Sequence, residues 1–88
     1  MSTGARSVSG VVRDAAGRPV AQARVYFLKG PVALPDTALL TGRDGRFAMS
    51  APQPGTYDVG CTSDAHGSAS ARVTVGNADV TLDLQLPR

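Results

Sequence analysis

The chain has 88 residues, of which 42% are hydrophobic and 5% aromatic, with no Trp. This length suits one domain with a single core, and it leaves no second lobe to close over a substrate, which disfavours most enzyme architectures. No apolar run approaches the roughly 20 residues that span a bilayer, so we expect no membrane insertion. We predict a disordered tail over residues 1–6 and one domain over residues 7–88.

The formal net charge is +2, but the charges are unevenly distributed along the chain. Residues 1–46 hold seven Lys and Arg against three Asp, whereas residues 47–88 hold two Arg against four Asp. Such an asymmetry is able to orient a domain against an acidic partner, although solvated strand faces are the simpler explanation. Because the cations are spaced singly and the aromatic residues do not alternate with them, we expect no nucleic-acid binding.

Cysteine usage and the N-terminus bear on the cellular compartment. Cys61 is the only cysteine, which excludes an internal disulfide and a zinc site of several thiolates. The first seven residues are polar and lack the apolar stretch of a secretory signal. The sequence as given therefore predicts a cytoplasmic location, or a secreted or cell-surface one if the segment belongs to a longer protein.

Short alternating runs separated by Gly, Pro and Asp predict an all-β fold. The first strand is expected over residues 7–13, with Val8 and Val12 on its inner face. Residues 14–19 contain turn-forming residues, and a second strand is expected over residues 21–29. Its alternate face carries Tyr26 and Leu28, which suggests burial on both sides or an edge covered by a loop.

The middle of the chain contains the longest connection, residues 30–36, whose two prolines are incompatible with a central strand. A third strand is expected over residues 37–41. The pair Asp44 and Gly45 is then a strong hairpin signal, and it leads into a strand with Phe47 and Met49 facing the core.

Three more strands complete the pattern. Residues 56–62 place Tyr57, Val59 and Cys61 on one face, and residues 68–75 alternate small apolar with polar residues. Residues 79–86 show the clearest alternation of all. Seven short strands predict a β-sandwich, antiparallel or mixed, with a small open barrel as the alternative.

At this point the sequence resembles the carboxypeptidase regulatory-like family, whose members adopt a transthyretin-like (prealbumin-like) sandwich related to the Ig-like type. The resemblance spans nearly the whole chain, and its elements are specific when taken in order. The residues that carry it are Gly10, Val11, Val12, Asp14, Gly17, Pro19, Ala23, Val25, Thr41, Asp44, Gly45, Phe47, Pro54, Gly55, Tyr57 and Val59.

The resemblance implies a non-catalytic accessory module, because members of the family are appended to enzymes, adhesins, receptors and parts of secretion machines. We therefore expect a structural or protein-interaction domain that serves a larger protein or assembly, such as a secretion spike or a cell-surface system. We expect a protein partner and a monomeric chain. The alternative function is a domain that binds a small ligand or a carbohydrate.

Residues able to perform chemistry are few, so we predict no enzyme, no catalytic residue, no cofactor and no metal site. His66 lies in a turn, where we expect it to be solvated, and Cys61 faces inward as a small hydrophobe. We expect Tyr57 to bury its ring and to hydrogen-bond the backbone through its hydroxyl. A cross-link between Lys29 and Asn77, as in pilin-type relatives, is a minor alternative because both are expected to be exposed.

The candidate partner contacts are Val32, Ala33, Leu34 and Tyr26. The first three lie between Pro31 and Pro35 and form a stiff apolar tip, which a partner can bind at a low ordering cost. The competing hypothesis, which we favour, is that Leu34 and Val32 cover the open end of the sandwich and seal its core. Tyr26 is the residue that a sugar-binding platform would have to expose.

Overall fold

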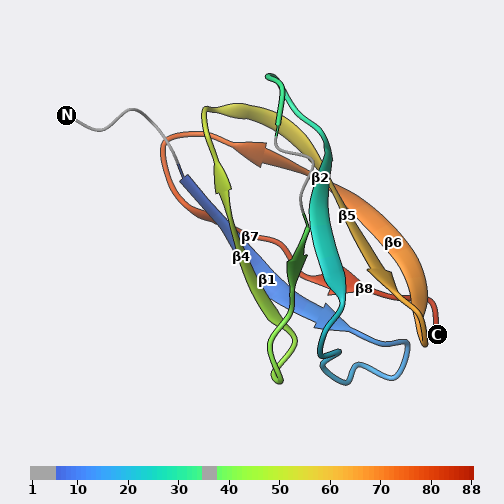
Figure 1. The fold of residues 1–88 in the computed structure, drawn as a ribbon. Helices are drawn as coiled ribbons and strands as arrows, with labels where there is room; N and C mark the ends of the chain where they lie inside the picture. Colours follow the sequence, from blue (N-terminus) through green and yellow to red (C-terminus); the bar gives the residue numbers. More distant parts are fainter. Residues whose placement is uncertain (1–5, 35–37) are drawn as a thin grey trace.

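The computed structural model describes residues 6–34 and 38–88, and this part of the chain forms two packed β-sheets without a helix (Figure 1). The strands are β1 (Arg6–Arg13), β2 (Arg24–Lys29), β3 (Leu39–Leu40), β4 (Arg46–Ala51), β5 (Gly55–Ser63), β6 (Gly67–Val75), β7 (Val80–Thr81) and β8 (Leu84–Gln85). The predicted all-β sandwich is confirmed.

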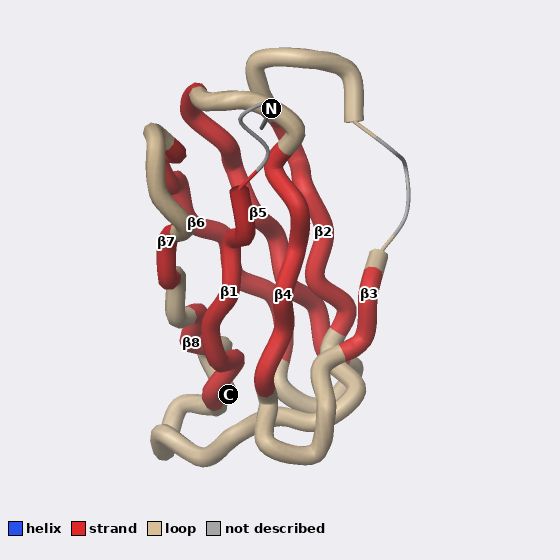
Figure 2. Tube along the Cα trace, turned by 90° about the vertical axis from the view of Figure 1, so that its left-hand side faces the viewer, coloured by secondary structure: helices blue, strands red, loops and turns tan. Residues whose placement is uncertain are grey.

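The two sheets have different topologies. In the first sheet, β1 lies between an antiparallel β4 and the parallel strands β7 and β8. The second sheet is antiparallel throughout, in the order β3-β2-β5-β6. Figure 2 shows the first sheet, with β1 and β4, in front of the second. The sandwich is therefore of the mixed kind.

The strand expected over residues 79–86 is divided into β7 and β8, which raises the strand count from seven to eight. The division occurs opposite Gly10, where the backbone of Leu82 passes so close that a Cβ atom on Gly10 would lie 1.8 Å from the Leu82 carbonyl oxygen. Beside this point, the Asp83 carboxylate accepts a hydrogen bond from the Val11 N–H at 3.1 Å. The Val11 N–H therefore donates to a side chain, whereas in a continuous ladder it would donate to a backbone carbonyl of the neighbouring strand.

The turn at Asp44 and Gly45 is tight, as expected, but it does not join a hairpin. The Gly45 N–H donates to the Gly42 carbonyl at 3.0 Å, and Gly45 has a φ of 76°. However, β3 pairs with β2, whereas β4 pairs with β1, so the turn carries the chain from one sheet to the other. The predicted hairpin pairing is wrong because Thr41 is hydrogen-bonded to the segment that leads into β2.

Some expected boundaries also shift. The second strand begins at Arg24 rather than at residue 21, because residues 21–22 form a turn in which Gln22 has a φ of 59°. Strand β1 begins at Arg6, within the expected tail. Residues 1–5 of that tail, and residues 35–37 around the expected start of the third strand, lie outside the described residues.

The core consists of two clusters of buried residues between the sheets. The larger one includes Val25, Phe47, Val59 and Cys61, and the smaller one consists of Val8, Ala51, Tyr57 and Val75. The inward faces predicted for β4 and β5 are thus confirmed.

Tyr57 links the smaller cluster to the turn that precedes β5. Its ring is fully buried and lies 5.0 Å from the ring of Phe27, measured between centroids. Its hydroxyl donates to the Gln53 carbonyl at 2.6 Å. The predicted structural role of Tyr57 is therefore confirmed.

Thr41 ties the turns at one end of the sandwich together. Its side chain is 4% exposed, and its hydroxyl donates to the Val20 carbonyl at 2.6 Å while it accepts a hydrogen bond from the Ala23 N–H at 2.9 Å. One hydroxyl therefore satisfies two backbone groups that water does not reach.

Replacing Thr41 by Val should lower the free energy of unfolding by about 2 kcal/mol, because the Val20 carbonyl and the Ala23 N–H lose their partner inside the protein. Urea denaturation monitored by circular dichroism measures this change. Thr74→Val is the matched control, since Thr74 is exposed on β6. Equal stabilities of the two variants would contradict the assigned role.

Candidate interaction surface

The outer face of the second sheet carries the most prominent exposed apolar side chains of the described residues. Leu28 on β2 is 58% exposed, and Leu40 on β3 is 61% exposed. Leu40 pairs with Arg24 across the β2–β3 ladder, so it lies diagonally next to Tyr26 on the same face. We call Tyr26, Leu28 and Leu40 the outer-face patch.

Gly60 on β5 shapes this patch. It pairs with Tyr26, and a Cβ atom at Gly60 would lie 2.4 Å from Tyr26 Cε1 and 3.0 Å from Leu28 Cγ. The absence of a side chain therefore lets both neighbours lie flat on the sheet. The Tyr26 hydroxyl is hydrogen-bonded to Thr62 Oγ1 at 2.7 Å, which holds the ring in place. The patch is thus preorganised.

A polar border accompanies the patch on its β6 side. Arg72 Nε donates to the Asp58 carboxylate at 2.9 Å, and this hydrogen bond holds the pKa of Asp58 below its usual value. A shallow depression beside this ion pair is lined by Leu28, Asp58, Ser70, Ala71 and Arg72. The arrangement resembles the apolar centre and polar rim of protein interfaces.

The four predicted contact residues do not form one surface. Tyr26 lies on the outer face, whereas Leu34 is half-buried and packs against the smaller core cluster. Val32 is 36% exposed and Ala33 is exposed, so within the loop only Leu34 occupies the sealing position. Leu28 and Leu40 were not among the predicted contacts, although strict alternation along β2 already places Leu28 on the face of Tyr26.

The groups considered for chemistry are separated or unreactive. His66 is half-buried rather than solvated, and its Nδ1 donates to the Arg88 carbonyl at 2.6 Å. Cys61 is fully buried, which raises the pKa of its thiol to about 11. Lys29 and Asn77 are both exposed, which does not fit a cross-link in a dry core.

The described residues contain neither a cluster of metal ligands nor a membrane-spanning helix. No group of three or more His, Cys, Asp or Glu side chains in this part of the chain is placed to hold a metal ion. The same residues contain no helix long and apolar enough to cross a bilayer.

Leu34→Ser should lower the free energy of unfolding by about 1 kcal/mol, because a half-buried leucine loses its contacts with the core cluster. Chemical denaturation measures the change. Val32→Ser, two residues away and more exposed, should change the stability by less than about 0.5 kcal/mol. A larger effect at Val32 than at Leu34 would show that the loop packs differently.

Cys61 should resist alkylation by iodoacetamide in the native protein at pH 8. At this pH only about one thiol in a thousand is ionised when the pKa is about 11, and the side chain is not accessible. Labelling followed by mass spectrometry should be slow in buffer and fast in denaturing urea. Labelling at the same rate in both conditions would contradict the burial of Cys61.

Comparison with known proteins agrees with this structure. The model of the family described as the carboxypeptidase regulatory-like domain matches residues 7–87, which is nearly the whole chain. Among curated proteins, no relative of the chain is found. The family match and the two-sheet sandwich agree with each other. The chain belongs to the carboxypeptidase regulatory-like domain family.

Proposed function

We propose that this domain is a non-catalytic protein-interaction module that docks onto a larger protein or assembly through the outer-face patch. The observation that carries the proposal is the group formed by the held ring of Tyr26 and the exposed side chains of Leu28 and Leu40 on the outer face of the second sheet, where Arg24 lies directly opposite Leu40. The family match supports a non-catalytic role. The module serves as an adaptor for an assembly such as a secretion spike or a cell-surface system.

The partner is a folded protein with an apolar surface of its own. Burying the exposed leucines removes apolar area from water, at about 25 cal/mol per Å². Because the Tyr26 ring is already held by Thr62 and by its packing over Gly60, it loses little freedom on binding. Tyrosine is also enriched at the centres of interfaces, where few residues supply most of the binding energy.

The other sheet is a poorer docking face. Its outer side has a broad depression of about 490 Å³, lined by Ser9, Gly10, Val11, Arg46, Phe47, Ala48, Thr81 and Asp83. Phe47, the one aromatic residue in this lining, is directed into the core and is only 5% exposed. The outer-face patch of the second sheet therefore remains the stronger candidate.

Carbohydrate binding is the second candidate function. Tyr26 lies on the same sheet face as the polar pair Asp58 and Arg72, and an aromatic ring with polar groups on one face suits a stacked sugar. However, Leu28 and Leu40 surround that ring with groups that form no hydrogen bonds with hydroxyls. This environment favours a protein partner over a sugar.

Site-specific photo-crosslinking in the host cell tests the proposal. Benzoylphenylalanine placed at Leu28 should give one discrete adduct with a protein, whereas the same group at Thr81, on the other sheet, should give none. Tyr26→Ser combined with Leu40→Ser should abolish the adduct while the domain stays folded by circular dichroism.

Two results would count against this function. Equal adducts from both positions would show contact without a specific surface. Binding to a glycan array that is lost in Tyr26→Ala, together with no protein adduct, would support the carbohydrate alternative instead.

A further inference from the structure

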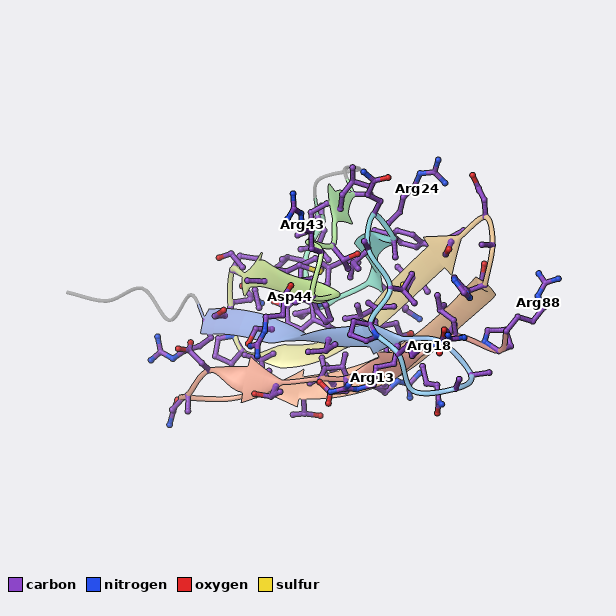
Figure 3. All side chains as sticks on the ribbon, turned by 90° about the horizontal axis from the view of Figure 1, so that it is seen from below. Arg13, Arg18, Arg24, Arg43, Asp44 and Arg88 are labelled. Atoms are coloured by element: carbon purple, nitrogen blue, oxygen red, sulfur yellow. The ribbon has the colours of Figure 1, made fainter. Side chains whose placement is uncertain are left out.

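The positive charge of the folded domain is concentrated at one end. Figure 3 shows the domain from below, the side on which the turns over residues 14–19 and 42–45 contact each other and the turn over residues 64–66 also lies. Figure 3 labels six charged residues at this end: Arg13, Arg18, Arg24, Arg43, Asp44 and Arg88. Asp14, Asp64 and Arg46 belong to the same end because they form ion pairs with Arg18, Arg24 and Asp44, respectively. The charged side chains in the rest of the described chain balance: Arg6, Lys29 and Arg72 against Asp58, Asp79 and Asp83.

The aspartates at this end leave much of the arginine charge available. Arg13 and Arg43 form no ion pair with the described residues. Arg24 lies 3.9 Å from Asp64, whose side chain is 94% exposed, so this pair is weak.

Asp14 forms an ion pair with Arg18, whose Nε lies 3.4 Å from Asp14 Oδ2, and its other carboxylate oxygen is engaged with the backbone. Its Oδ1 accepts hydrogen bonds from the N–H groups of Arg18 and Ala16, both at 2.9 Å. The Arg18 N–H in particular holds the pKa of Asp14 below its usual value. Asp14 therefore shapes the turn that carries Arg18.

The turns that carry these arginines are locked against each other. The Val12 N–H donates to the Gly45 carbonyl at 2.8 Å. A Cβ atom at Gly45 would lie 3.0 Å from the Val20 nitrogen and 3.1 Å from Pro19 Cβ, so the two turns are in direct contact. The backbone beneath Arg13, Arg18 and Arg43 is thus fixed before any ligand arrives, which lowers the ordering cost of binding.

We infer that this basic end, defined by Arg13 and Arg43, binds an acidic segment of a protein. Guanidinium groups bind carboxylates with paired hydrogen bonds, which suits an Asp- or Glu-rich peptide.

The aromatic residues give a second reason to favour a protein. Phe27, Phe47 and Tyr57 contribute to the core, and the Tyr26 hydroxyl is bonded on the sheet face. Among the described residues, therefore, no aromatic side chain lies at the basic end in a position to stack on a nucleic-acid base. This inference goes beyond the proposed function, since it concerns a different surface and holds whether or not the outer-face patch binds a partner.

Titration of the ¹⁵N-labelled domain with a ten-residue peptide of alternating Glu and Ser tests the inference. The amide and arginine Nε signals of residues 13–19 and 42–46 should shift, and the affinity should fall as salt is added. Arg13→Gln combined with Arg43→Gln should weaken binding about fivefold. Arg6→Gln combined with Lys29→Gln removes the same charge elsewhere and should change the affinity less than twofold.

Three outcomes would overturn the inference. Equal weakening by both double variants would show a response to net charge alone, and no shift at millimolar peptide would show that the end is not a binding surface. Tighter binding of a ten-nucleotide oligothymidylate through the same amides would identify nucleic acid instead. Thermal melting of each variant shows that the fold is intact, so a loss of binding is not mistaken for unfolding.

Discussion

The sandwich depends on the close approach of the chain to the central strand β1 at Gly10. Strand β1 pairs with β4 on one side and with β7 and β8 on the other, and the Leu82 carbonyl passes where any larger residue at position 10 would place its Cβ. This contact holds the last part of the chain parallel to the first. Leu84 and Leu86, which follow it, are then buried in the larger core cluster.

Polar side chains of this small domain mostly complete backbone hydrogen bonds. Asp79 and Asp83 accept from N–H groups of β1, Asp14 and Thr41 satisfy the turns, and Tyr57 binds a carbonyl ahead of its own strand. No buried side-chain nitrogen or oxygen in the described part of the chain lacks a partner. These groups therefore shape the turns and the strand ends of the sandwich.

The two proposed surfaces lie where side chains are not engaged in this way. Gly60 leaves the sheet without a side chain where Tyr26 and Leu28 lie flat, and the interlocked turns hold Arg13 and Arg43 without a counter-ion among the described residues. A small domain with one apolar face and one charged end is able to bind two neighbours at once, or one neighbour in a defined orientation. On these two proposals, the charged end would accelerate and orient the encounter, and burial of the apolar face would supply most of the affinity.

Local patterns in the sequence were sufficient to predict most strands, the inward faces of β4 and β5, and the burial of Tyr57 and Cys61, because alternation and turn residues act over a few positions. The pairing of β3 with β2, the division of the last strand at Gly10, and the half-buried His66 required the tertiary structure. The two surfaces also required the tertiary structure. Alternation places Leu28 outward, but it does not show that Leu40 lies beside Tyr26. Arg13 and Arg43 are separated by thirty positions in the sequence, and only the contact between their turns brings them to the same end. Each of these features depends on contacts between distant segments, and such contacts are decided by how the two sheets pack rather than by any short run of residues.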